Sequence, residues 1–322
     1  MDESKVEYCS DELLCGIDGG GTTTKVVVCN LEGQVLHLFQ SGTINHYGAG
    51  IPKVKENFAI IAAEFIEKFA CVPGTIFIGN SALEGLADDA LVQELTEGVF
   101  HRSKVVFHSD VYVALLSFTM GNPGAVLISG TGSMACGIDA EGAYHTAGGW
   151  GQVLGDEGSA YHIALKGIHA ALHAYDGLSE PTQLGTSVMK FFDLKKMHDI
   201  IDLIYNPPVE KSVIAAFAPE VNRAAEEGDP AALQILESEA EWLYKLALAI
   251  TTRCKTQSLG YFGSVLKYNH RIRSKLSAML EVQSIALQVP RFKPEIGALI
   301  GAFRESGKPV SDSVIDNLSK YS

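Results

Sequence analysis

The sequence lacks a long apolar run, a paired-cysteine motif and an excess of positive charge. None of its 322 residues belongs to a run approaching the roughly 18–20 consecutive apolar residues of a membrane span. Six cysteines are scattered without a C-x-x-C pair, which favours free thiols over disulfides or a zinc site. The formal net charge is −13, with 25 Lys and Arg against 38 Asp and Glu. We therefore expect no nucleic-acid partner, because nucleic-acid binding needs a basic face.

We also expect no secretory signal from the first residues of the sequence. The acidic start Met1-Asp2-Glu3 does not supply the basic and apolar regions of a signal peptide. We therefore expect a cytoplasmic protein without a membrane partner. A hydrophobic share of 47% with 20% charged residues is typical of soluble globular chains. The length allows two domains, since single cores stop growing at about 250–300 residues.

Glycine is plentiful, at 32 of 322 residues, and two glycine-rich loops follow strand-like segments. Gly130-Thr131-Gly132-Ser133 follows the apolar run 125–128, and Asp18-Gly19-Gly20-Gly21-Thr22-Thr23-Thr24-Lys25 follows 13–17. Backbone N–H groups in such turns can point at a phosphate. Two of these loops in one chain predict a nucleotide held between two lobes.

The first loop also offers the groups that a magnesium-bound polyphosphate needs, namely the carboxylate of Asp18, three hydroxyls and the Lys25 cation. It is neither a Walker A loop nor a dinucleotide-binding loop, because its glycines are contiguous and a strand follows instead of a helix. A glycine-rich hairpin without a ligand is the alternative.

Apolar patterning predicts an α/β protein in which one architecture occurs twice. We expect strands at 13–17, 25–29 and 34–39, then helix 54–69, strand 76–78, helix 91–97, strand 105–107 and helix 111–120. A second three-strand meander follows at 125–129, 134–138 and 143–146. Helices are expected at 156–175, in pieces of 184–205, at 230–255 and at 297–303, with a strand at 259–262. The predicted domains are 10–120, with 305–322 as a candidate addition, and 121–304.

Three further groups of residues are candidates for chemistry. Asp110 follows a strand and could accept a proton from an attacking hydroxyl, with a helix N-cap as the alternative. The segment Gly148–Ser159 contains Trp150 and Asp156 among five glycines, which suits one wall of a carbohydrate site, called the sugar wall below; a capped helix start is the alternative. His162, His169 and His173 share one helical face, where a packed or surface stripe is favoured over a zinc site.

With these residues together, the chain resembles the superfamily of sugar kinases, heat-shock ATPases and actin. Within it, the chain is similar to the N-acetylglucosamine kinase and BadF/BadG/BcrA/BcrD ATPase-like family. The resemblance runs from about Gly16 to Phe303 and is most specific in Val126–Ser133, Gly148–Gly151 and Gly155–Tyr161.

This resemblance implies two actin-like (ribonuclease H-like) α/β lobes with a nucleotide and sugar cleft between them. It implies ATP and Mg²⁺ as cofactors, Mg²⁺ near Asp18, Asp110 as the base for a sugar 6-hydroxyl, and a homodimer. The implied nucleotide-binding residues are Gly20, Gly21, Thr22, Thr23, Lys25, Gly130, Thr131, Gly132, Ser133, Gly263 and Ser264. Of these, Gly263 and Ser264 belong to the loop that is implied to meet adenosine. The implied sugar-binding residues are Asn45, Asp110, Thr131, Gly149, Trp150 and Asp156.

The expected function is therefore an ATP-dependent kinase that phosphorylates the 6-hydroxyl of an amino sugar. N-acetylglucosamine is the first candidate, followed by glucosamine and N-acetylmuramic acid. Gly79-Asn80-Ser81-Ala82 departs from the Leu-Ser-Gly-Gly type of turn in the animal enzymes, which leaves the sugar's N-substituent open. Two alternatives stay open, an ATPase that activates a dehydratase or reductase through an iron–sulfur cluster, and a sugar sensor without turnover. No paired cysteine accompanies Cys136 for such a cluster.

Overall fold

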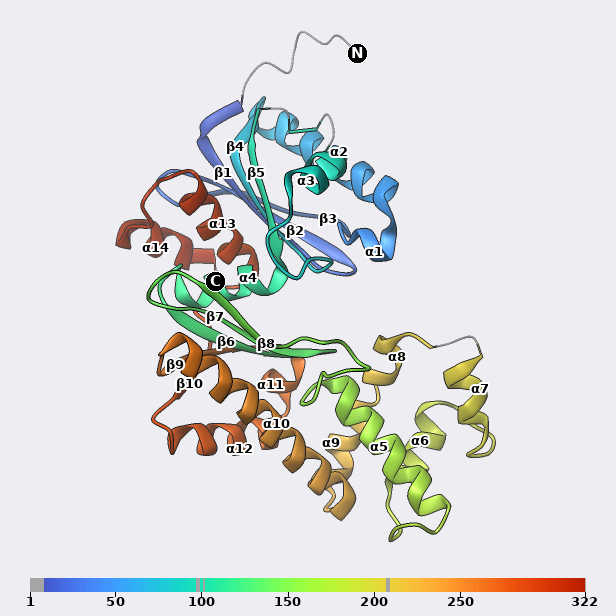
Figure 1. The fold of residues 1–322 in the computed structure, drawn as a ribbon. Coiled ribbons are helices and arrows are strands. Elements are labelled where there is room, and N and C mark those ends of the chain that lie inside the picture. Colours follow the sequence, from blue (N-terminus) through green and yellow to red (C-terminus); the bar gives the residue numbers. More distant parts are fainter. Residues whose placement is uncertain (1–8, 97–98, 101, 207–208, 322) are drawn as a thin grey trace. The chain divides into compact units, whose positions relative to one another are not determined.

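The computed structural model describes the chain except residues 1–8, 97–98, 101, 207–208 and 322 (Figure 1). The chain forms two compact units. The first comprises Met1–Asn122 together with Pro290–Ser322, and the second comprises Pro123–Val289.

The first unit is built on a five-stranded mixed sheet with the strand order β3-β2-β1-β4-β5. Its first three strands form the predicted antiparallel meander, with Asp18 opposite Lys25 and Gly19 opposite Thr24 at the end of the first hairpin. β4 runs parallel to β1, and β5 runs parallel to β4. The strands are β1 (Cys9–Gly19), β2 (Thr23–Asn30), β3 (Val35–Gly42), β4 (Val72–Asn80) and β5 (Lys104–Ser109).

Alternate residues of the central strands face two different layers of helices, because successive side chains of a strand point to opposite faces. On one face, Ile17 and Ile78 pack with Phe58 of α2. On the other face, Gly16 and Phe77 lie against α13. The helices of this unit are α1 (His46–Ala49), α2 (Ile51–Phe69), α3 (Asp89–Thr96), α4 (Asp110–Thr119), α13 (Pro294–Glu305) and α14 (Asp312–Leu318).

Helix α13 belongs to the first unit, although the expected division placed residues 121–304 in the second lobe. A Cβ at Gly16 would overlap the backbone of Leu299, and a Cβ at Gly297 would overlap the carbonyl of Val113 in α4. These glycines let α13 pack closely on β1 and α4. Figure 1 shows the red C-terminal helices beside the blue N-terminal strands. The chain therefore returns to the first unit at Pro290, and the sequence offered no marker for this long-range contact.

The second unit repeats the architecture of the first. Its sheet has the order β10-β9-β6-β7-β8, in which β6, β7 and β8 form an antiparallel meander and β9 and β10 continue in parallel. The β6–β7 hairpin thus holds the topological position of the β1–β2 hairpin, which confirms the predicted repeat. The strands are β6 (Gly124–Ser129), β7 (Ser133–Ile138), β8 (Tyr144–Gly148), β9 (Ser258–Phe262) and β10 (Ala286–Gln288).

Helix α10 provides most of the cover for one face of this second sheet. Its residues Leu243 and Ala247 share a core with Leu127 and Ala135 of the sheet. Asp229 caps the helix as predicted, by accepting a hydrogen bond from the backbone N–H of Ala232 at 3.0 Å. The helices of this unit are α5 (Ala160–Tyr175), α6 (Leu184–Phe191), α7 (Asp199–Tyr205), α8 (Lys211–Ala215), α9 (Ala218–Glu226), α10 (Pro230–Cys254), α11 (Ser264–Tyr268) and α12 (His270–Glu281).

The helix expected at 156–175 begins four residues late, at Ala160. Asp156 and Gly158 have positive φ angles of 67° and 85°, which a right-handed helix does not allow. Ser159 caps the helix instead, accepting from the backbone N–H of His162 at 3.1 Å. None of the helices in the described ranges is both long and apolar enough to cross a membrane.

Candidate functional site

The loop of the β1–β2 hairpin is an exposed turn with open space above its backbone. The N–H of Gly20 donates to the carbonyl of Thr23 at 3.1 Å, which leaves Gly21 and Thr22 at the tip. No atom of the described residues lies within 4 Å of the position that a Cβ would take at Gly21. The backbone of this tip is therefore accessible to a ligand as large as a phosphate.

Lys25 forms an ion pair with a residue that sequence analysis missed. Asp18 and Lys25 are register partners in the hairpin, so both project from the sheet face that α13 covers. There the Lys25 ammonium lies 3.4 Å from each carboxylate oxygen of Glu295. The Glu295 side chain is 6% exposed, and that of Lys25 is 38% exposed. An acidic residue in the first turn of a helix is usually explained by its favourable interaction with the helix dipole. The sequence therefore gave no indication that Glu295 pairs with Lys25.

The carboxylates near this pair are electrostatically crowded. Burial raises the pKa of Asp18 to about 6, the charges of Glu295 and Asp110 add to the rise, and Lys25 opposes it. Within the described part of the chain, no three acidic, histidine or cysteine side chains are close enough to form a metal-binding group. The first unit therefore holds an excess of negative charge around Asp18 without a preformed metal cage.

Asp110 is the first residue of α4, and it is not the N-cap. Ser109 takes that role, because its hydroxyl accepts from the backbone N–H of Tyr112 at 3.2 Å. Burial raises the pKa of Asp110, while hydrogen bonds from the backbone N–H groups of Val111 and of Asp110 itself oppose that rise. The capping alternative for Asp110 is thus wrong, and its carboxylate remains a candidate proton acceptor.

Asn45 contacts the segment where the sequence departs from the animal kinases. Its side-chain oxygen accepts from the backbone N–H of Gly48 at 3.0 Å, and its amide nitrogen donates to the Ser81 hydroxyl at 3.0 Å. The neighbouring Asn80 is buried and donates to the carbonyl of Ile44 at 3.1 Å. Asn80 is therefore a structural residue, whereas Asn45 and Ser81 form a polar pair beside it.

The β6–β7 hairpin is held by the glycine-rich segment that follows β8. The hydroxyl of Ser129 donates to the carbonyl of Gly158, and the hydroxyl of Ser133 donates to the carbonyl of Glu157, both at 2.6 Å. The first N–H of α5, from Ala160, donates to the carbonyl of Gly130 at 2.8 Å. Two segments that were predicted separately, the phosphate loop and the sugar wall, are therefore one hydrogen-bonded structure.

Asp156 binds the hairpin and a lysine that sequence analysis missed. One carboxylate oxygen accepts from the backbone N–H of Ser133 at 3.1 Å, and the other contacts the ammonium of Lys211 at the start of α8. The Asp156 side chain is 4% exposed and that of Lys211 is 29% exposed. Trp150, the aromatic residue of the predicted sugar wall, is 73% exposed.

Glu239 of α10 holds the segment that follows β8 through a contact with Gly158. Its buried carboxylate accepts a hydrogen bond from the backbone N–H of Gly158, lies 3.0 Å from Nδ1 of His162 and lies 2.7 Å from the Lys166 ammonium. Burial alone would raise the pKa of Glu239, but His162 and Lys166 hold it below the usual value. His162 therefore contacts Glu239, while His169 and His173 stack on each other with ring centroids 6.4 Å apart.

The predicted adenosine loop lies directly against the second hairpin. Gly263 has a φ of 97°, and a Cβ there would overlap the carbonyl of Ser129. A Cβ at Gly130 would in turn lie 3.9 Å from the Cα of Gly263. Only glycine fits at position 263, and a Cβ at Gly130 would lie 4.0 Å from the backbone nitrogen of Ser264.

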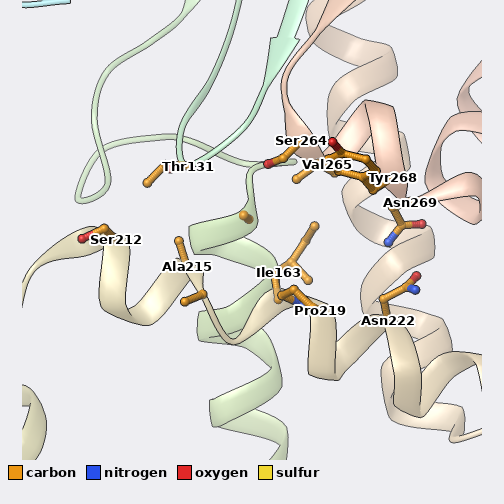
Figure 2. A pocket seen from close by; sticks show the side chains of 13 residues that line it. Thr131, Ile163, Ser212, Ala215, Pro219, Asn222, Ser264, Val265, Tyr268 and Asn269 are labelled. Carbon is orange, nitrogen blue, oxygen red and sulfur yellow. The ribbon is translucent and has the colours of Figure 1, made fainter. Parts of the chain in front are cut away.

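A cavity of about 360 Å³ opens beside these two loops (Figure 2). Thr131, Ser212 and Ser264 line it together with apolar residues of α5, α8 and α9. Figure 2 shows Asn222 and Asn269 at the opposite end from Thr131 and Ser212. Its size and mostly apolar lining with a few polar groups are typical of small-molecule sites. Sequence analysis found Thr131 and Ser264 but missed α8 and α9, whose short apolar spacing resembles ordinary core.

The predicted site residues thus fall into two groups. The first unit contains Asp18, Gly20, Gly21, Thr22, Thr23, Lys25, Asn45 and Asp110, and the second contains Gly130, Thr131, Gly132, Ser133, Gly149, Trp150, Asp156, Gly263 and Ser264. Each group gathers around one of the two equivalent hairpins.

Known proteins are similar to this chain in sequence and in fold. The model of the BadF/BadG/BcrA/BcrD ATPase family matches residues 15–302. The N-acetylmuramic acid/N-acetylglucosamine kinase of Clostridium acetobutylicum is 32% identical over 240 residues, which cover 73% of this chain and 78% of that protein. The glucosamine kinase of Vibrio cholerae is 26% identical over 308 residues, covering 94% and 98%.

A solved structure supports the fold at low sequence identity. A candidate N-acetylglucosamine kinase from Chromobacterium violaceum matches with a TM-score of 0.70 and 22% identity, covering 90% of this chain and 98% of that one. This match confirms the predicted class of two actin-like α/β lobes. Because the family model spans nearly the whole chain, this protein belongs to the BadF/BadG/BcrA/BcrD ATPase family.

Proposed function

We propose that this protein is an ATP-dependent kinase that transfers the γ-phosphate to the 6-hydroxyl of an amino sugar, foremost N-acetylglucosamine. The observation that carries the proposal is the pair of equivalent glycine hairpins, one flanked by carboxylates and the other by a lysine and a cavity. Phosphoryl transfer needs positioning and charge neutralisation around a polyphosphate. The amino-sugar kinases among its relatives favour this acceptor class.

ATP is proposed to place its adenosine in the cavity next to Thr131 and Ser264. The apolar lining suits the faces of a purine ring, and the asparagines at the far end offer groups for its edge. The phosphates then lie along Gly130–Ser133, with the tip of the first hairpin as the second phosphate-binding loop. For catalysis, groups of both units must act on one nucleotide and one sugar.

Mg²⁺ is proposed to bind at Asp18. The residues fit this ion, because Asp18 is a carboxylate whose charge is penalised by burial and by Glu295 and Asp110. Magnesium is usually held by one or two carboxylates, several waters and the substrate phosphates, so a preformed cage of protein ligands is not needed. When bound, the ion neutralises phosphate charge and orients the polyphosphate.

Asp110 is proposed as the base that accepts the proton of the sugar 6-hydroxyl. Its position in the first turn of α4 and its raised pKa suit a carboxylate that must take up a proton. As the oxygen of the 6-hydroxyl bonds to the γ-phosphorus, the proton moves to Asp110. The bond between the γ-phosphorus and the bridging oxygen breaks, and ADP keeps that electron pair.

The sugar is proposed to lie against Asn45, Thr131, Gly149, Trp150 and Asp156. The exposed Trp150 offers an apolar face for a sugar ring. Both oxygens of Asp156 already have partners, yet a carboxylate can accept about four hydrogen bonds, so a sugar hydroxyl can be added. The Asn45–Ser81 pair is the place where the N-substituent is expected to be selected.

A coupled assay of ADP release tests this function. It compares N-acetylglucosamine, glucosamine, N-acetylmuramic acid, N-acetylmannosamine and glucose with a sample that contains no sugar. We expect an amino sugar to raise the turnover well above the ATPase background and the product to be the 6-phosphate by NMR. Sugar binding without any ADP release would support a sensor and contradict the kinase.

The activator hypothesis predicts an iron-containing preparation. Cys136 is buried within β7, which does not suit a cluster ligand at an interface. We therefore expect a colourless protein without bound iron. The homodimer implied by the resemblance and the cytoplasmic location expected from the sequence remain proposals, and sedimentation analysis tests the first of them.

A further inference from the structure

Lys211 places its ammonium at the second hairpin. It begins α8, and its Nζ contacts one oxygen of Asp156 while the other oxygen holds the N–H of Ser133. A Cβ at Gly132 would lie 3.0 Å from both Lys211 Nζ and Asp156 Oδ1. The ammonium is therefore in close contact with the backbone of the loop at Gly132, and glycine at that position makes the contact possible.

The ammonium of Lys211 has N–H donors in addition to the one directed at Asp156. An ammonium has three N–H donors, and among the contacts of the described residues one is directed at Asp156. The acid is almost fully buried, whereas the lysine keeps 29% of its side chain exposed. The carboxylate is fixed by the loop, and the cation that it holds faces outward with donors available for an anion.

The position of Lys211 relative to the cavity identifies that anion. Ser212, the next residue, lines the cavity at the same end as Thr131 (Figure 2). A nucleoside in the cavity would thus direct its phosphates past Thr131 toward Gly132 and the Lys211 ammonium. The asparagines occupy the other end, where they can meet the base.

We propose that Lys211 binds the β- and γ-phosphates of the nucleotide, and that Asp156 is the positioning residue that holds its ammonium over Gly132. This inference rests on the proposed kinase function. When the bond between the γ-phosphorus and the bridging oxygen breaks, ADP gains a negative charge, and Lys211 stabilises that charge. The second hairpin thereby combines backbone N–H groups with one fixed cation.

Binding of ATP, ADP, AMP and adenosine, measured without sugar, tests the proposal. We expect Lys211→Met to weaken the binding of ATP and ADP by about 10–100-fold, because a charged hydrogen bond is lost. Adenosine binding stays within about twofold of the wild type, since the cavity itself is unchanged. Lys211→Arg keeps the charge and restores most of the ATP affinity. Asp156→Asn, which releases the ammonium, lowers ATP affinity by about 3–10-fold.

A matched control removes a cation of similar exposure from the same unit. Lys275 is 32% exposed and pairs with Glu241 at 3.1 Å on the surface of α10 and α12. Lys275→Met should leave all four affinities within about twofold, because surface ion pairs contribute little. Circular dichroism and melting curves show whether each variant is folded.

Three outcomes would overturn the proposal. An unchanged ATP affinity in folded Lys211→Met would show that the lysine does not contact phosphates. Equal losses for ATP and adenosine, or an Arg variant no better than Met, would assign Lys211 to loop structure. Failure of the kinase function looks different, because the wild type would then release no ADP with any sugar, whatever its nucleotide affinities.

Discussion

The two equivalent hairpins carry opposite electrostatic environments. Among the described residues around the first, Asp18, Asp110 and Glu295 outnumber the Lys25 cation, and the pKa of Asp18 rises to about 6. Around the second, Asp156 is paired with Lys211, and Glu239 is paired with His162 and Lys166. The same topology thus supports one hairpin with an excess of negative charge and another whose carboxylates are paired.

This difference teaches how one duplicated architecture can perform two tasks. The first hairpin leaves carboxylates whose charge a divalent cation and a substrate proton would relieve. The second hairpin is held by hydrogen bonds from the segment that follows β8, and we propose that its amide and ammonium donors bind phosphates. The shared topology determines where both loops lie. The charged residues outside the loops give the two hairpins their different proposed roles.

The largest effect is expected from the acidic hairpin, at Asp110. We expect Asp110→Asn to lower kcat by roughly 10²–10⁴, because the amide cannot accept the hydroxyl proton. ATP affinity should stay near the wild-type value, unlike that of the Lys211 variant. Steady-state kinetics and nucleotide titration measure the two quantities. A variant with near-normal turnover would remove Asp110 from catalysis and with it the division of roles between the units.

The anchor of the second hairpin is expected to matter most for stability. Glu239→Gln should lower the free energy of unfolding by about 3–5 kcal/mol at pH 7, because it weakens two charge-assisted contacts of a buried carboxylate, those to the partly exposed His162 and Lys166. The folded-state pKa of Glu239 is lowered, so its contribution is present above the unfolded pKa. It is lost as the pH falls through the folded pKa. The gap between variant and wild type should therefore shrink in acid.

Urea unfolding at several pH values measures this gap. The neighbouring Glu237 is 56% exposed and lies 3.7 Å from Lys275, which makes Glu237→Gln a matched control with an expected change below about 0.5 kcal/mol. Equal effects of the two substitutions would contradict the anchoring role of Glu239.

The same glycine-to-alanine change should act differently near the two hairpins. Gly263→Ala is expected to cost about 2–4 kcal/mol of stability, because φ is positive and the methyl group would meet the Ser129 carbonyl. Gly21→Ala has open space at its Cβ, so its stability should change by less than about 1 kcal/mol. Its KM for ATP should nevertheless rise if the tip binds phosphate. Denaturation curves measure the free energy of unfolding of both variants, and steady-state kinetics measure their KM for ATP. A Gly263→Ala variant as stable as the wild type would contradict the close contact with Ser129.

The smallest expected effect has the opposite sign to that of Glu239. Because the folded-state pKa of Asp18 is raised from 3.8 to about 6, the folded protein holds this proton more tightly than the unfolded chain. Stability is therefore lost as the pH rises from about 4 to 6. Without magnesium, Asp18→Asn should stabilise the protein by about 1–3 kcal/mol at pH 7–8 and not at pH 4. Unfolding curves of Asp18→Asn and the wild type between pH 4 and 8 test this prediction. A variant less stable than the wild type at pH 7.5 would contradict the unfavourable burial and charge repulsion at Asp18.

The sequence predicted the parts of the molecule that depend on local pattern. The strand meanders, α2, α10 and both glycine loops follow from apolar spacing and turn residues, as with Asp229 before Pro230. The partners of these loops could not be predicted, because Glu295, Lys211 and Glu239 become neighbours only when distant segments pack together. α13 was assigned to the wrong lobe for the same reason, and the helix at 156–175 was drawn too long because positive φ at Asp156 has no sequence signature.

The return of α13 to the first unit determines when each half of the protein can be completed during synthesis. Residues 123–289 are continuous, so the second hairpin and its anchor can form while the ribosome is still adding the C-terminal segment. The first sheet, although made earlier, lacks the helix that covers Gly16 and the Glu295 partner of Lys25 until the last thirty or so residues emerge. The second hairpin can therefore be completed before the first, although the first is synthesised earlier.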